Sequence, residues 1–212
     1  MVGRLHVLTD FHFQQRHSHA ALARLAVAGG ADTVQFRQKA GTVRDLLANL
    51  RPVVAVCREA GVPLVVDDHL DLALAVGADG VHLGQLDLPV ADARAVLDRC
   101  GGPTRLVGAT ATTAEEAAAA EAAGADYVGF GPVFPTGSKA NPASVKGLAG
   151  LARACAAVRI PVVAIAGITP ERVRAVLEAG AHGVAVMTAV TTAPDPRAAT
   201  ARFREEIERT IT

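Results

Sequence analysis

Short apolar runs alternate along the chain with longer segments in which apolar residues recur at helical spacing. The runs are rich in Val and Leu, which is typical of strands buried on both faces of a parallel sheet. Eight strands are predicted, at residues 4–9, 32–37, 62–66, 79–84, 104–109, 126–131, 160–166 and 182–187. Helices are predicted between and after them, at 18–29, 42–60, 70–76, 89–99, 113–123, 144–157, 170–179 and 196–210.

One phrase recurs where a helix ends and a strand begins: GADTV from residue 30, GADGV from 77, GADYV from 124 and GAHGV from 180. The glycine is expected to end the helix in the left-handed conformation, so the repeat needs no catalytic explanation. The regular alternation and the repeat predict an α/β fold, a single (β/α)8 TIM barrel over residues 1–212. A doubly wound open sheet is the alternative.

Composition excludes several classes of function. The chain has 212 residues, half of them apolar, and its 21 acidic residues balance its 21 basic ones. We therefore expect no nucleic-acid partner and no membrane partner. Cys57, Cys100 and Cys155 lack motif spacing and are expected to be reduced, buried thiols of a cytoplasmic protein. The oligomeric state stays open, with a homo-oligomer among the alternatives.

Polar residues gather where the predicted strands end, which is where TIM barrels carry their active sites. In strand order they are Gln35, Arg37 and Lys39; Asp67 and Asp68; Asp87; Thr110; Thr136, Ser138 and Lys139; Gly167; and Met187 and Thr188. Asp68 and Asp87 suit Mg²⁺, which usually takes one or two protein carboxylates together with water and phosphate oxygens. The three cations in this set suit the phosphates of a small-molecule substrate. The turn at 165–171 enters a helix and predicts a second anion site.

Structural explanations compete with these functional ones. Asp67 or Asp68 could cap the helix predicted from residue 70, and for one of them we expect this role rather than metal binding. His82 alternates with Val81 and Leu83 and is expected to lie in the barrel wall. Convergence at one end of the barrel favours the functional interpretation more than any single residue does.

Four motifs carry a resemblance to a known family: QFRQK (35–39), VVDDHLDLALAVGADGVHLGQLDLP (65–89), GADYVGFGPVFPTGSK (124–139) and IPVVAIAGITPERVRAVLEAGAHGVAVMTAV (160–190). Over nearly its whole length the chain resembles the thiamine phosphate synthases. Their sister group, the thiazole tautomerases, shares the fold and many of the same sequence motifs. The resemblance implies a Mg²⁺-dependent transferase that joins an aminopyrimidine methyl diphosphate to a thiazole phosphate and releases pyrophosphate.

The resemblance also implies a role for each matching residue. Asp68 and Asp87 would hold Mg²⁺, and Arg37, Thr110 and Lys139 would act in catalysis. The substrates would be bound by Gln35, Arg37, Lys39, Asp67, Thr110, Thr136, Ser138, Lys139, Gly167, Met187 and Thr188. Within this set, Thr136, Ser138 and Lys139 would contact the diphosphate, and Gly167, Met187 and Thr188 would bind the thiazole phosphate through backbone amides.

Some positions depart from the family pattern. Asp67 replaces the usual asparagine, Leu86 and Ala166 replace an acidic residue and a glycine, and Thr112 stands where a histidine is common. A tautomerase needs a proton-exchanging side chain, which Thr112 does not supply. A thiazole tautomerase and a non-catalytic barrel that binds thiazole phosphate are the alternative functions.

Overall fold

The computed structural model describes residues 2–102, 104–138 and 144–211, and its strands form one closed parallel barrel in sequence order. The strands are β1 (Leu5–Thr9), β2 (Thr33–Phe36), β3 (Leu64–Asp67), β4 (Gly80–Leu83), β5 (Leu106–Ala111), β6 (Tyr127–Phe130), β7 (Val162–Ile165) and β8 (Gly183–Val186). The predicted TIM barrel is therefore confirmed, and the open-sheet alternative is wrong.

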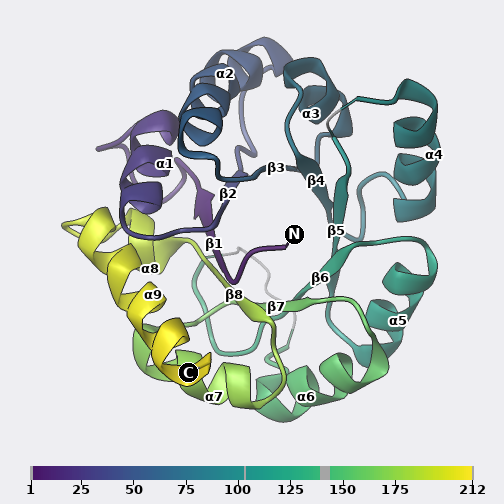
Figure 1. Cartoon of the computed structure of the whole chain (residues 1–212), viewed down its shortest axis with the longest axis vertical. Helices are drawn as coiled ribbons and strands as arrows, with labels where there is room; N and C mark the ends of the chain where they lie inside the picture. Colours follow the sequence, from purple (N-terminus) through teal and green to yellow (C-terminus); the bar gives the residue numbers. More distant parts are fainter. Residues whose placement is uncertain (1, 103, 139–143, 212) are drawn as a thin grey trace.

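Helices form a ring around the barrel (Figure 1). They are α1 (His19–Ala28), α2 (Val43–Ala60), α3 (Leu70–Val76), α4 (Val90–Cys100), α5 (Ala114–Ala122), α6 (Gly147–Ala157), α7 (Pro170–Glu178), α8 (Thr188–Thr191) and α9 (Pro196–Ile211). Each predicted helix is present, although α6 begins three residues later than expected. The short helix α8 was not predicted, because four residues are too few for a helical period to show in the sequence.

The glycines of the repeated phrase have the expected left-handed backbone, with φ of 95° at Gly30, 62° at Gly77, 96° at Gly124 and 100° at Gly180. The aspartates that follow lie at the amino end of the barrel and tie neighbouring strands together. Asp32, Asp79 and Asp126 each accept a hydrogen bond from a backbone amide at the start of the preceding odd-numbered strand. The repeat is structural, as its sequence indicated.

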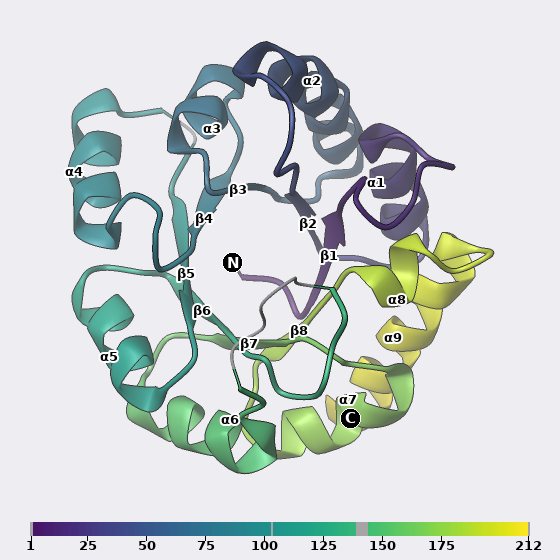
Figure 2. The same cartoon turned by 180° about the vertical axis from the view of Figure 1, so that it is seen from behind.

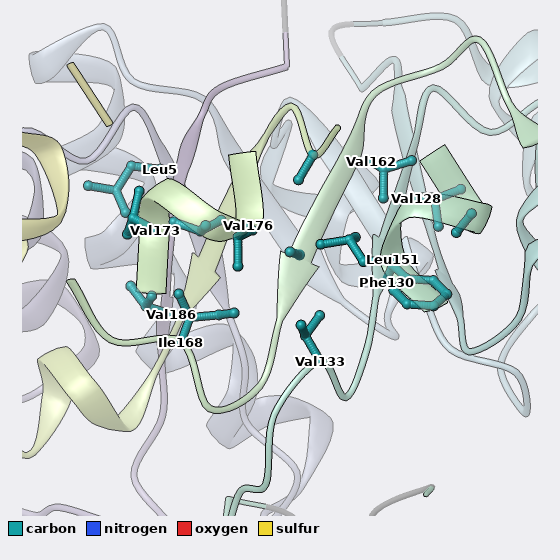
Figure 3. Packing of buried hydrophobic residues seen from close by; sticks show 14 of the residues in the cluster. Leu5, Val128, Phe130, Val133, Leu151, Val162, Ile168, Val173, Val176 and Val186 are labelled. Atoms are coloured by element: carbon teal, nitrogen blue, oxygen red, sulfur yellow. The ribbon is translucent and has the colours of Figure 1, made fainter. Parts of the chain in front are cut away.

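Most of the core lies between the barrel and the helices. Figure 3 shows side chains from β6, β7 and β8 packed against those of α6 and α7 in the larger of two such clusters. A third, smaller cluster fills the barrel interior with Leu8, Tyr127, Val163 and Ala185. Val2 packs against it, and Figures 1 and 2 show the segment that leads into β1 near the barrel axis.

The three cysteines carry free thiols, but they are not all buried. Cys57 is buried in α2, and burial raises the pKa of its thiol to about 12. Cys100 ends α4 and is exposed, and Cys155 is only half-buried, so the expectation of three buried thiols is wrong for these two residues. Within the described part of the chain, no helix has both the length and the apolar character that crossing a membrane requires.

Candidate active site

A network of opposite charges occupies the carboxyl ends of β1, β2 and β3. Arg37 follows β2, and its guanidinium pairs with the carboxylate of Asp10, which follows β1. The Arg37 Nε atom also lies 3.5 Å from Asp67 Oδ2. Gln35, which points into the barrel, donates from Nε2 to Asp67 Oδ1 at 2.7 Å. The structure thus brings together Gln35 and Arg37, from the end of one predicted strand, and Asp67, from the end of the next.

Lys39 extends this network to the next carboxylate. Its ammonium nitrogen lies 3.0 Å from Asp67 Oδ2 and also pairs with Asp68. Burial disfavours the charge on Lys39, but the two carboxylates outweigh burial and raise the pKa of the ammonium above its ordinary value. Lys39 is therefore a permanent cation at this end of the barrel.

The expected capping role of Asp67 or Asp68 is wrong. Helix α3 begins at Leu70 after His69, and no side chain caps it. Asp68 has a left-handed backbone, with φ of 64°, and its amide donates to the carbonyl oxygen of His82 at 2.8 Å. Both carboxylates form ion pairs with Lys39 instead of the helix amides.

Asp87 lies in the loop after β4. Its Oδ2 atom accepts a hydrogen bond of 2.7 Å from the amide of Gly84. A Cβ atom at Gly84 would lie 2.8 Å from that oxygen, so the turn depends on glycine at this position. Among the described residues, the Gly84 amide is the hydrogen-bond partner of the Asp87 carboxylate, and it engages one of the two carboxylate oxygens.

The carboxylates at this end of the barrel are compared with the ligands that a divalent metal requires. Within residues 2–102, 104–138 and 144–211, no group of three or more His, Cys, Asp or Glu side chains could hold a metal ion. Mg²⁺ does not require such a group, because it commonly takes one or two carboxylates and completes its shell with water and phosphate oxygens. Asp68 and Asp87 follow the adjacent strands β3 and β4, so they fit a site of this kind.

His82 and Thr110 face each other inside the barrel. His82 Nε2 lies 3.0 Å from Thr110 Oγ1, and His82 Nδ1 lies 3.1 Å from the hydroxyl oxygen of Tyr127. Burial lowers the pKa of His82 and raises the pKa of Tyr127, so both side chains are neutral near pH 7. His82 is part of the barrel wall, as expected, and its ring is hydrogen-bonded to Thr110, a predicted site residue.

Hydroxyl groups from the segment after β6 and from α8 meet at the opposite side of the opening. Thr136 Oγ1 lies 3.0 Å from Ser138 Oγ, which lies 3.1 Å from Thr188 Oγ1. Figure 2 shows the described part of the segment that follows β6 running past the ends of β7 and β8. Lys139, predicted to belong to this group, lies outside the described residues.

The turn after β7 approaches the same hydroxyl groups. Ala166 and Gly167 both have left-handed backbones, with φ of 79° and 66°. A Cβ atom at Gly167 would lie 2.5 Å from the carbonyl oxygen of Pro135, so only glycine allows this close approach of two loops. Met187 immediately precedes α8, which places the predicted residues Gly167, Met187 and Thr188 on neighbouring strand ends.

Two residues of the site were not among the predicted ones. Asp10 follows the first strand, and its buried carboxylate pairs with Arg37. Tyr127 looked like an apolar strand residue, since nothing in the sequence shows that its hydroxyl meets His82. Thr112 lies at the start of α5, where its amide and hydroxyl both bond to Glu116. The Thr112 side chain therefore hydrogen-bonds to the first turn of α5.

Known proteins of one family are similar to this chain over nearly its whole length. A family model described as thiamine monophosphate synthase matches residues 5–190. A thiamine-phosphate synthase of Salinibacter ruber is 63% identical over 207 residues, which cover 98% of this chain and 89% of that protein. A thiamine-phosphate synthase of Moorella thermoacetica is 47% identical, covering 89% of this chain and 88% of its own.

Solved structures show the same relationship. A thiamine phosphate pyrophosphorylase from Pyrococcus furiosus superposes with a TM-score of 0.88 at 38% identity, covering 99% of this chain and 97% of that one. An N-acetylmannosamine-6-phosphate 2-epimerase from Clostridium perfringens superposes with a TM-score of 0.67 at 20% identity, covering 95% and 92% of the two chains. The second similarity extends to the fold alone.

Proposed function

The chain belongs to the thiamine monophosphate synthase family and is a transferase that makes thiamine phosphate, and we propose which of its side chains serve each part of that reaction. The substrates are an aminopyrimidine methyl diphosphate and a thiazole phosphate. The bond between the pyrimidine methylene carbon and the diphosphate oxygen breaks, and its electrons leave with the diphosphate. The lone pair of the thiazole nitrogen then forms the new carbon–nitrogen bond.

The observation that carries the proposal is the charge network at the ends of β1 to β3. Arg37 and Lys39 are held in place by Asp10, Asp67 and Asp68 before any substrate binds. Cations in fixed positions stabilise the charge that grows on a leaving diphosphate without having to reorganise. We assign Gln35, Arg37 and Lys39 to the pyrimidine diphosphate, with Asp67 as the acceptor that orients all three.

The charge balance of this region supports a requirement for Mg²⁺. Among the described residues at the ends of β1 to β4, Asp10, Asp67, Asp68 and Asp87 supply four carboxylates, whereas Arg37 and Lys39 are the cations paired with them. A diphosphate entering next to this excess of negative charge would be repelled unless a further cation accompanied it. Asp68 and Asp87 are the residues that would hold Mg²⁺, and the ion would supply charge neutralisation at the diphosphate oxygens.

The hydroxyl group of Thr110 is assigned to the pyrimidine, and those of Thr136 and Ser138 to the diphosphate, together with Lys139. The thiazole phosphate is assigned to the turn at Gly167 and to the backbone around Met187 and Thr188. The contact between Ser138 and Thr188 supports this division, because the two segments assigned to the two phosphate groups meet there, after β6 and β8. A cytoplasmic location, expected from the unpaired cysteines, belongs to the same proposal.

The test is formation of thiamine phosphate from both substrates, with and without Mg²⁺. Asp68→Asn and Asp87→Asn are expected to reduce turnover by about a hundredfold or more, the size of loss seen when a fixed electrostatic group is removed from an active site. Asp71→Asn is the matched control, because Asp71 lies on the solvent side of α3 with its side chain 68% exposed. Full turnover in excess chelator, or equal losses in all three variants, would refute the metal assignment.

A further inference from the structure

Two aromatic rings, those of His82 and Tyr127, lie next to each other near Thr110 inside the barrel, with their planes tilted by 34°. Tyr127 is 2% exposed, and its ring centroid lies 5.5 Å from that of His82. His82 bridges Tyr127 and Thr110 through its two ring nitrogens, at 3.1 and 3.0 Å. The three side chains form one chain of hydrogen bonds that runs from the buried interior to the half-buried hydroxyl of Thr110.

The backbone is built around this pair of rings. A Cβ atom at Gly108 on β5 would lie 2.2 Å from Tyr127 Cζ and 2.5 Å from His82 Nδ1. A Cβ atom at Gly129 on β6 would lie 2.9 Å from His82 Cε1. Neither glycine has a left-handed backbone, so both are explained by the space that the rings occupy. The two glycines therefore provide the space in which the rings of His82 and Tyr127 pack.

The direction of the hydrogen bonds follows from the buried phenol. A phenol hydroxyl carries one hydrogen, and leaving a buried donor unpaired costs more than a hydrogen bond normally contributes. Among the described residues, His82 Nδ1 is the only side-chain partner of the Tyr127 hydroxyl. Nδ1 must therefore accept, which leaves the proton of a neutral imidazole on Nε2. The Nε2–H group then donates to Thr110 Oγ1, and the hydroxyl hydrogen of Thr110 points elsewhere.

We propose that Tyr127 is a positioning residue that acts through His82 to make Thr110 a hydrogen-bond donor to the substrate. A threonine hydroxyl can otherwise either donate or accept. Here His82 donates to one of the two lone pairs of Thr110 Oγ1 and leaves the hydroxyl hydrogen free, so Thr110 presents a donor to an acceptor atom of the substrate. This rests on the proposed function, in which Thr110 faces the pyrimidine, and a pyrimidine ring nitrogen is an acceptor of the required kind.

The first test measures the protonation of His82 without any substrate. In protein labelled with ¹⁵N at histidine, the imidazole signals of His82, identified by their loss in His82→Asn, are expected to show a bare Nδ1 and a protonated Nε2. Tyr127→Phe keeps the ring and removes the donor, so it is expected to give a mixture of the two tautomers. Val163→Ala, which alters the same interior cluster without touching the hydrogen-bond chain, is the control and should leave the wild-type tautomer. A wild-type signal with the proton on Nδ1, or an unchanged tautomer in Tyr127→Phe, would overturn the proposal.

The second test separates the two substrates. Tyr127→Phe and Thr110→Val are both expected to raise KM for the pyrimidine diphosphate about tenfold, the effect of one hydrogen bond to a substrate, while KM for the thiazole phosphate changes less than about twofold. Thr110→Ser keeps the hydroxyl and should recover most of the affinity lost in Thr110→Val. Equal increases in both KM values would show a general structural role and contradict the assignment. If wild-type protein forms no thiamine phosphate, the proposed function fails, whereas the tautomer of His82 still tests the direction of the hydrogen bonds.

Discussion

Replacing Arg37 by methionine is expected to destabilise the fold by about 3 kcal/mol, a typical cost of leaving a buried charge without its partner. The Asp10 side chain is 3% exposed and that of Arg37 is 18% exposed, so water cannot take over the role of the guanidinium at Asp10. We place the cost at the lower end of the usual range because Asp10 keeps one other hydrogen bond, from the amide of His12.

The neighbouring carboxylate should contribute little to this cost. Asp67 lies 3.5 Å from Arg37 Nε, but it also accepts from Gln35 and pairs with Lys39, and both contacts remain in the variant. The destabilisation therefore has one main source, the isolated carboxylate of Asp10. Adding Asp10→Asn to Arg37→Met removes that charge and is expected to restore at least half of the lost stability.

Urea unfolding followed by far-ultraviolet circular dichroism measures these differences as changes in the midpoint at constant slope. In thermal unfolding, the single variant should melt about 6–12 °C lower for a chain of this size. A loss below about 1 kcal/mol in Arg37→Met, or no recovery in the double variant, would refute the reasoning. Because Arg37 is also assigned to the diphosphate, its kinetics should be measured well below the melting temperature of the variant.

Two further outcomes are expected for side chains of the barrel interior. Burial lowers the pKa of His6 to about 4, below its ordinary value in the unfolded chain, so the unfolded state binds more protons as pH falls through this window. Because of His6, the free energy of unfolding should fall by about 2 kcal/mol when the pH is lowered from 7.5 to 5. The variant His6→Gln should lack this part of the pH dependence, which urea unfolding at the two pH values measures. Gly108→Ala should cost more than about 2 kcal/mol, since its Cβ would overlap an aromatic ring, whereas Gly61→Ala, with open space around it and φ of 65°, should cost about 1 kcal/mol. Equal costs for the two alanine variants would contradict the packing argument.

The barrel could be predicted because its strands and helices carry strong local signals. The apolar runs, the helical periods and the repeated Gly-Ala-Asp phrase all depend on neighbouring residues, and the structure confirms them. The function of the aspartates in that phrase could not be predicted in the same way. Asp79 accepts from the amide of Leu64, which lies fifteen residues earlier in the chain, and no local pattern records such a contact.

The same limit applies to the site. Arg37 and Lys39 stood out because cations are unusual directly after buried strands. Asp10 did not stand out, since its importance comes from a partner 27 residues away. The capping expectation for Asp67 and Asp68 failed for a related reason: local propensity favours the helix amides, but the ammonium of Lys39 is the stronger partner and comes from another strand.

The two ends of the barrel handle their carboxylates in opposite ways. At the amino end, Asp32 and Asp126 each accept backbone hydrogen bonds and pair with an arginine, so their charges are compensated within the protein. At the carboxyl end, Asp10, Asp67 and Asp68 share Arg37 and Lys39, and the Asp87 carboxylate accepts from the Gly84 amide without an ion pair among the described residues, so negative charge is in excess around these four aspartates. Self-repulsion of this kind lowers stability, so stability alone does not account for it. The excess is understandable if a cation and an anionic substrate complete the site together, which is why removal of Mg²⁺ and neutralisation of Asp68 or Asp87 should affect catalysis much more than folding.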